Sequence, residues 1–178
     1  MSAETAQTPE NTSELFFQKI ADIQQEAKAN RSNLEAAEGE SRSAIILQLL
    51  ADEEELRSVL GDVLGHVEML KEDGQETNAL IPRIKSVLTE QSNTLYQDIE
   101  AAGRRLAKIN EIDHSEATAD ELEQLSRQVA AINDFLDGMH MVAYENIERQ
   151  KALDLNPAAD VKKLKSVLQN RVEKLAGY

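Results

Sequence analysis

The stretch 49–70, LLADEEELRSVLGDVLGHVEML, decides the fold. Its apolar residues recur at alternating intervals of four and three, the spacing of a helix that packs along one face against other helices. The positions on this line are Leu49, Glu53, Leu56, Leu60, Val63, Val67 and Leu70. Further apolar residues widen the stripe, namely Ile45, Ile46, Leu50 and Leu64. The sequence therefore predicts a central helix over about 41–73.

The same spacing occurs in four other segments. It predicts helices over about 12–37, 78–110, 118–153 and 156–178. The first follows Phe16, Ile20, Ile23, Ala27, Asn30, Leu34 and Ala37, and the second follows Ile84, Leu88, Gln91, Leu95, Ile99, Ala102, Leu106 and Ile109. The third follows Leu122, Leu125, Val129, Ile132, Leu136, Met139, Ala143 and Ile147, and the last follows Val161, Leu164, Leu168, Val172 and Leu175.

Boundary signals agree with these segments. Gly39 indicates a break between the first two helices, and Gly74 suits the left-handed position that follows a helix. Thr118 and Glu121 form the pattern of a capping box, in which each side chain bonds the other residue's backbone N–H. Asn-Pro at 156–157 is a typical start of the last helix.

Composition also favours an all-α fold. Aromatic residues make up only 3% of the chain, and seven Gly and three Pro are few for an all-β or Rossmann protein. Because short turns join long helices, we expect an elongated antiparallel bundle of four long helices with coiled-coil-like packing. We assign 1–12 to a flexible N-terminal segment, 13–155 to the bundle, and 156–178 to a fifth helix that is docked or serves as a linker.

The charge restricts the possible partners. The net charge of −14 disfavours nucleic acid, which is itself densely negative, and we expect no nucleic-acid partner. The absence of cysteine excludes disulfides and thiol chemistry. No run of 18 apolar residues is present, and a membrane-spanning helix needs about 20.

The sequence offers little support for catalysis or metal binding. It has neither a G-x-S-x-G motif nor a glycine-rich phosphate loop. A di-iron bundle needs two Glu-x-x-His helices, but here Glu111 and His114 lie in an expected loop, and Asp137 and His140 are only a near match. His66 lacks such spacing altogether. We therefore predict no enzyme activity, no catalytic, cofactor-binding or metal residues, and no cofactor.

Several residues allow both a structural and a functional interpretation. Asn30 is either a buried residue that fixes helix register or part of a solvated end. His140 is either a pH-sensitive core residue or, as we prefer, a flanking or hydrogen-bonded histidine. Met139 and Met141 should point to different faces, so they cannot share a metal ion.

Mid-helix glycines carry a further prediction. Gly61 and Gly65, and likewise Gly103 and Gly138, lie inside expected helices, where each costs about 1 kcal/mol relative to alanine. We predict that they allow a neighbouring helix to approach closely; the alternative is tolerated surface glycine.

The segment 144–178, YENIERQKALDLNPAADVKKLKSVLQNRVEKLAGY, resembles a stretch of bacterial membrane proteins of the small-conductance mechanosensitive channel superfamily. The shared features are the helix end ENIERQKAL, the turn DLNPAAD and the onward run LQNRVEKLAGY. The resemblance implies a helical extramembrane region before transmembrane helices, with a structural or modulatory role and no part in conduction. It also implies that the chain stops because a longer protein was cut, while a natural terminus at Tyr178 is the competing interpretation.

Three functions follow as expectations. The first is a non-catalytic extracytoplasmic module of a mechanosensitive-channel-like protein, periplasmic, acting in structure, oligomerisation or sensing. Its partners would be protein surfaces, including a second copy, and the downstream transmembrane region. The second is a ligand-sensing domain of a chemoreceptor or histidine kinase, with Arg104 and Arg105 as the only adjacent arginines. The third is a soluble, cytoplasmic helical adaptor or chaperone.

Overall fold

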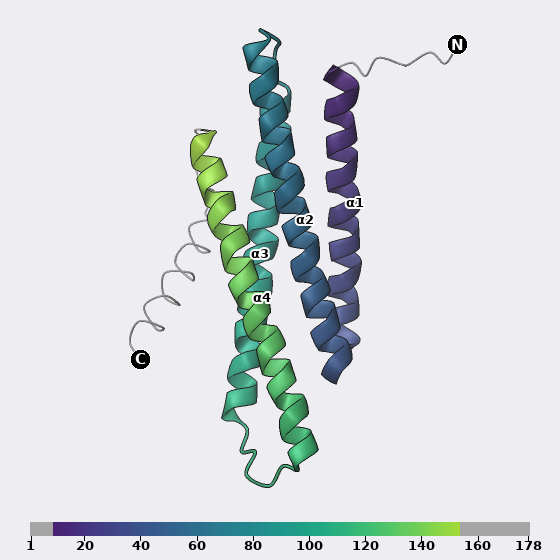
Figure 1. Ribbon diagram of the computed structural model, residues 1–178, viewed down its shortest axis with the longest axis vertical. Helices are drawn as coiled ribbons and strands as arrows, with labels where there is room; N and C mark the ends of the chain where they lie inside the picture. The colour runs from purple at the N-terminus through teal and green to yellow at the C-terminus, as the bar shows by residue number, and fades with distance from the viewer. Residues whose placement is uncertain (1–8, 154–178) are drawn as a thin grey trace, which may run out of the picture.

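The computed structural model describes residues 9–153, which form four long helices (Figure 1). They are α1 (Pro9–Ala36), α2 (Gly39–Glu72), α3 (Leu80–Glu111) and α4 (Ala119–Ala152). The prediction of an all-α fold is confirmed. The predicted helix over 156–178 lies outside the described residues. The first helix already begins at Pro9, within the segment 1–12 that was assigned to a flexible lead-in.

Local chemistry explains where the helices begin and end. Gly39 and Gly74 adopt φ values of +57° and +71°, which only glycine accommodates at little cost. The Thr118 side chain accepts a hydrogen bond from the Glu121 backbone N–H, and the Glu121 carboxylate accepts one from the Thr118 N–H. This reciprocal pair confirms the predicted capping box at the start of α4.

Close backbone packing joins the helices in the order α1, α2, α4, α3. Within the described part of the chain, α1 packs on α2, α2 on α4, and α4 on α3. Consecutive helices run in opposite directions, so α2 and α4 lie parallel, as do α1 and α3 (Figure 1). The remaining side, between α1 and α3, is bridged by long side chains, including Glu14 with Arg83 and Arg31 with Asp98. This side is therefore more open than the other three.

Two glycines explain the close contact of α2 with α4. A Cβ atom at Gly138 would collide with the Leu50 side chain, and one at Gly61 would lie 3.1 Å from Nη2 of Arg149. The prediction of close packing is confirmed at these two positions. It is wrong at Gly65 and Gly103, where nothing lies within 4 Å of an added Cβ.

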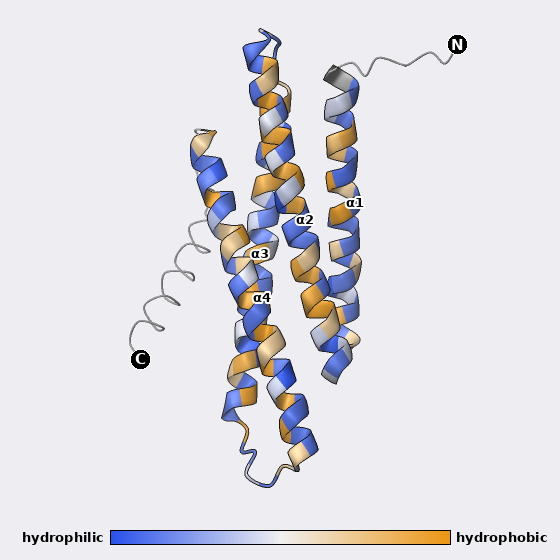
Figure 2. Ribbon diagram, viewed as in Figure 1, coloured by the Kyte–Doolittle hydropathy of each residue, from blue (hydrophilic) through white to orange (hydrophobic). Residues whose placement is uncertain are grey.

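The apolar interior forms two separate clusters, and polar and apolar residues alternate along every helix (Figure 2). The α1 cluster comes from α1, α2 and α3 and contains Phe17, Ile20, Ile23, Leu56, Val59, Leu60, Val63, Val67, Ile84 and Leu88. The α4 cluster comes mainly from α2, α3 and α4 and contains Ala27, Ile46, Leu49, Leu95, Ile99, Ala102, Ile109, Ile132, Phe135, Leu136, Met139, Val142, Ala143 and Ile147. The bundle thus consists of two overlapping three-helix regions that share α2 and α3.

The expected apolar lines are correct in the middle of each helix and wrong at two ends. Phe17 is buried where Phe16 was expected, and Phe16 packs against the α1 cluster only in part. Leu122 is exposed, because the first turns of α4 lie beyond the residues that form the α4 cluster. Periodicity identifies a face but does not show how far neighbouring helices extend along it.

Candidate functional site: a buried polar layer and its groove

A layer of polar side chains from all four helices crosses the bundle between the two apolar clusters. We call it the polar layer. Its members are Asn30 and Arg31 on α1, Asp52 and Glu53 on α2, Gln91, Ser92 and Asp98 on α3, and Asn146 and Gln150 on α4. Because buried polar groups are costly unless they are hydrogen-bonded, the contacts within this layer decide what it can do.

Arg31 is the only cation of the polar layer and holds two carboxylates. Its Nε lies 3.0–3.1 Å from the two oxygens of Asp98, and its Nη2 lies 2.8 Å from both Asp98 Oδ2 and Glu53 Oε1. The side chains of Arg31, Glu53 and Asp98 are 24%, 4% and 13% exposed. Such forked contacts are the strongest that a guanidinium makes, and here they tie α1 to both α2 and α3.

The three charges shift one another's ionisation. Burial raises the pKa of Glu53, although hydrogen bonds from Gln91 and Arg31 oppose the rise. Burial likewise raises the pKa of Asp98 against the effect of Arg31. For Arg31, burial lowers the pKa, but hydrogen bonding and attraction to Asp98 and Glu53 together raise it above its usual value. Desolvation thus outweighs pairing for the two acids, and pairing outweighs desolvation for the cation.

A chain of amides extends from Glu53 to α4. Gln91 Nε2 donates to Glu53 Oε2 at 3.0 Å, and Asn146 Nδ2 donates to Gln91 Oε1 at 3.0 Å. Gln150 Nε2 then lies 3.3 Å from both Asn146 Oδ1 and Ser92 Oγ. Gln91 and Asn146 each donate to one group and accept from another, so this chain of hydrogen bonds links α2, α3 and α4 without a further charge.

Asn30 closes the layer on the side of α1 and α2. Its Nδ2 donates to Asp52 Oδ2 at 2.7 Å, and Gln48 Nε2 donates to the other oxygen at 3.0 Å. Of the two interpretations of Asn30, the structure favours the residue that fixes register, because its partner Asp52 is buried on the neighbouring helix.

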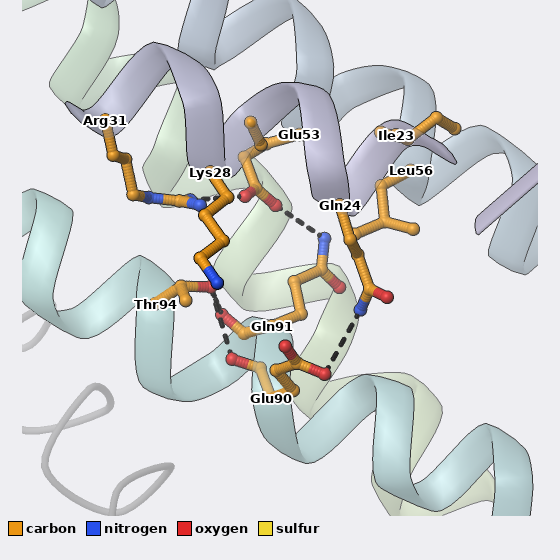
Figure 3. A pocket seen from close by; sticks show the side chains of 10 residues that line it. Ile23, Gln24, Lys28, Arg31, Glu53, Leu56, Glu90, Gln91 and Thr94 are labelled. Carbon is orange, nitrogen blue, oxygen red and sulfur yellow. Dashed lines mark hydrogen bonds and ion pairs between the residues drawn. The ribbon is translucent and has the colours of Figure 1, made fainter. Parts of the chain in front are cut away.

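A groove of about 280 Å³ opens beside the layer on the side between α1 and α3 (Figure 3). Ile23 and Leu56 give it apolar walls, and Arg31 and Glu53 lie at one end. Gln24 Nε2 reaches across to Glu90 Oε2 at 3.4 Å. The complete lining is Ile23, Gln24, Ala27, Lys28, Arg31, Glu53, Leu56, Glu90, Gln91 and Thr94. Lysine, arginine and two glutamates give it balanced charge.

One buried serine lies beside a buried histidine. Ser13 is buried, and its Oγ lies 3.1 Å from Nε2 of the buried His66. A nucleophilic serine also needs a group that orients the histidine and donors for an oxyanion. The ring of Phe16 lies against His66, with its centroid 5.6 Å from that of the imidazole. We therefore interpret Ser13 and His66 as a satisfied pair at one end of the α1 cluster.

The other candidate residues do not converge on one site. Nε2 of His114 lies 2.9 Å from the Ile109 carbonyl oxygen, and His140 is half-buried on α4. Met139 is buried and Met141 exposed, which confirms that they point to different faces. Within residues 9–153, no group of three or more His, Asp or Glu side chains is arranged to hold a metal ion.

The two adjacent arginines also diverge. Arg104 is exposed and pairs with Glu100 at 3.2 Å. Arg105 is half-buried and borders a small cavity that also includes Arg42. Arg104 and Arg105 therefore lie in different surroundings, one paired at the surface and one at a cavity.

Comparisons with protein-family models, with curated proteins and with solved structures give no match for this chain. No helix in residues 9–153 has the length and apolar character needed to cross a membrane.

The polar layer was missed by sequence reasoning, although a signal was present. Asn30, Glu53 and Gln91 all fall on predicted apolar lines, one in each of three consecutive helices. Three polar residues at core positions predict a polar cross-section once the helices are aligned antiparallel. Arg31 and Asp98 flank those lines and carry no such signal.

Proposed function

We propose that the chain is a non-catalytic extracytoplasmic helical module of a mechanosensitive-channel-like membrane protein. Its role would be structural, as a spacer or oligomerisation element, or sensory. The proposal that this module has no catalytic role rests on the polar layer, in which Glu53 and Asp98 bind Arg31. These buried charges hold one another, so they are not poised to act on a substrate. The link to a channel rests on the resemblance of residues 144–178.

The polar layer suits a rod that must keep a defined alignment. Apolar contacts tolerate sliding of one helix along another, whereas directional hydrogen bonds lose their partners when a helix shifts by one turn, about 5.4 Å. Arg31 links α1 to two helices, and Asn146 links α4 to α3. A force or a partner acting on one helix would thus be transmitted to all four.

The decisive experiment is to determine the source reading frame beyond codon 178. We expect it to continue into segments of about 20 apolar residues. A stop codon directly after Tyr178 would overturn the membrane role. If the frame continues, the full-length protein carrying Arg31→Met should show altered survival after osmotic downshock, and Arg104→Met should not.

The second candidate is a ligand-sensing domain of a chemoreceptor or histidine kinase. The groove between α1 and α3 favours it, because it is concave, partly apolar and lined by groups of both charges. Thermal-shift screening with amino acids and organic acids tests this candidate. A stabilising ligand whose effect disappears in Thr94→Met, which would fill the groove, would support it. No shift with any compound would count against it.

A further inference from the structure

The outer face of α4 carries a second line of residues, opposite the face that packs on α2 and α3. Its members are spaced by three and four, so they share one side of the helix. They are Asp134, Asp137, Met141, Tyr144 and Glu148, and all of them are exposed. Met141 and Tyr144 are each 59% exposed, and acids stand at both ends of the line. Within residues 9–153, no other helix covers this face.

The segment 156–178 has the complementary pattern. It lies outside the described residues, and its sequence predicts a helix that begins at Asn-Pro 156–157. An apolar line runs along this expected helix through Val161, Leu164, Leu168, Val172 and Leu175, and such a line needs a partner surface. Residues 161–178 contain five basic residues and one acid, in a chain whose net charge is −14. A basic amphipathic helix is thus expected directly after an acidic face with two exposed apolar residues.

The short connection brings the two lines level. α4 ends at Ala152 and the expected helix begins at Pro157, so few residues join them and the second helix returns antiparallel to the first. At about 1.5 Å per residue, 157–178 spans roughly 33 Å, which is long enough to cover the whole outer line. Leu168 then lies level with Met141, since the two are equally far from the connection.

We propose that residues 157–178 form a helix that docks antiparallel on the outer face of α4. Leu168 packs on Met141, and Leu164 packs on Tyr144, which removes the two exposed apolar side chains from water. The proposal names the surface and the register of this segment. It does not depend on whether the chain belongs to a membrane protein.

Charge complementarity selects this occupant. In the same register, Arg171 comes level with the turn of α4 that holds Asp137, and Lys165 comes within one turn of Glu148. Glu148 already lies 2.9 Å from Lys151, so Lys165 would join an existing exposed pair. If this face docked instead on the same face of a second copy, acids would lie against acids, and an anionic lipid surface would be repelled in the same way.

The first test uses the absence of cysteine from the chain, because an introduced disulfide then reports one contact. Met141→Cys with Leu168→Cys, and Tyr144→Cys with Leu164→Cys, should each form an internal disulfide under mild oxidation. Both should form at least about tenfold faster than Met141→Cys with Asn170→Cys, the matched control, because residues two apart point to different sides of a helix. Non-reducing gels and mass spectrometry separate the internal bridge from a linked dimer. A linked dimer in place of the internal bridge would assign the face to a second copy and overturn the proposal.

The second test measures hydrogen–deuterium exchange in the full chain without cysteine. Amides over 161–175 should be protected, because a helix of this length on its own is only marginally stable in water. Tyr144→Ser should speed their exchange at least about tenfold, since it removes an apolar contact of the docked helix. Leu122→Ser is the matched control and should leave this exchange unchanged, because Leu122 is an exposed apolar residue of the same helix that the segment does not reach.

Three results would overturn the proposal. They are cysteine pairs that both cross-link no faster than the Asn170 control, amides over 161–175 that exchange as in an unfolded chain, and equal behaviour of the two serine variants. Circular dichroism should show that every variant keeps its helices, because the substituted residues of α4 are exposed. None of these results bears on the channel-module proposal, which the reading frame tests.

Discussion

The two apolar clusters and the polar layer between them stabilise the same bundle by different physics. In the clusters, stability scales with apolar area removed from water, at roughly 25 cal/mol per Å², and does not depend on direction. In the polar layer, each contact has a fixed partner and angle, and its net contribution is small because three acids and one arginine have left water. The clusters thus favour a compact bundle, and the polar layer selects one alignment of its helices.

The two clusters also differ from each other. The α1 cluster has no buried residue from α4, and the α4 cluster takes only Ala27 from α1. The polar layer lies where α1 and α4 each meet the shared pair α2 and α3. In a bundle staggered in this way, apolar packing alone would allow α1 and α4 to slide along α2 and α3. The hydrogen bonds and ion pairs of the polar layer prevent this sliding at the junction.

The largest effect should come from Arg31→Met. It leaves Glu53 and Asp98 buried without their cation, and breaking a buried pair in this way costs about 3–5 kcal/mol. We expect the loss in the free energy of unfolding to be greatest at neutral pH and to shrink in acid, where the two acids are protonated. Urea denaturation followed by circular dichroism at several pH values measures it.

Arg104→Met is the control for that prediction. Arg104 is exposed and pairs with Glu100 one turn away, so its loss should change the free energy of unfolding by no more than about 0.5 kcal/mol. Equal effects of the two methionine variants would show that Arg31 stabilises no more than a surface ion pair does.

The next effect tests an apolar cluster. Leu60 is fully buried in the α1 cluster, and Leu60→Ala should cost about 2–5 kcal/mol through lost burial and the cavity left behind. Unlike the loss in Arg31→Met, this loss should not vary with pH. A Leu60→Ala penalty that shrinks in acid as much as the Arg31→Met penalty would contradict the distinction between clusters and layer.

Overpacking between α2 and α4 should have a smaller effect. A methyl group at Gly138 meets the Leu50 side chain, so Gly138→Ala should destabilise by about 1–3 kcal/mol despite the better helix propensity of alanine. Gly103→Ala is the matched control, because its added methyl meets nothing within 4 Å and should stabilise by up to about 1 kcal/mol. Thermal unfolding of both variants measures the two effects. If Gly138→Ala were as stable as Gly103→Ala, the close packing of α2 against α4 at Gly138 would be refuted.

The helices could be predicted from the sequence, but their mutual arrangement could not. Helix propensity, caps and periodicity are local, and they placed the second helix at 41–73 against the observed Gly39–Glu72. The contact of Arg31 with Asp98 joins residues 67 positions apart. An apolar line shows which face is buried and not which helix covers it, so the parallel pairing of α2 with α4 carried no sequence signal. Glu53 and Gln91 indicated a polar layer because they are polar residues on apolar lines. Their neighbour Arg31 lies beside such a line and gave no indication.

The smallest effect concerns the charge of Glu53. Because its pKa is raised above that of the unfolded chain, its contribution to stability is fully present below about pH 4.5 and is lost as the pH rises through the folded-state pKa. At neutral pH the buried carboxylate is thus a net cost relative to a neutral group. We expect Glu53→Gln to raise the free energy of unfolding at pH 7 by on the order of 1 kcal/mol, and the two proteins to converge near pH 4.

Glu54→Gln is the matched control for Glu53→Gln, because it removes the same charge from the adjacent, exposed position. The change that Glu54→Gln causes in the free energy of unfolding should be small, and it should not vary with pH as the change caused by Glu53→Gln does. If Glu53→Gln were instead less stable than the parent at pH 7, and this deficit shrank as the pH fell, the hydrogen bonds to Arg31 and Gln91 would outweigh desolvation. The polar layer would then stabilise the bundle as well as align it, and the contrast with the apolar clusters would be one of geometry alone.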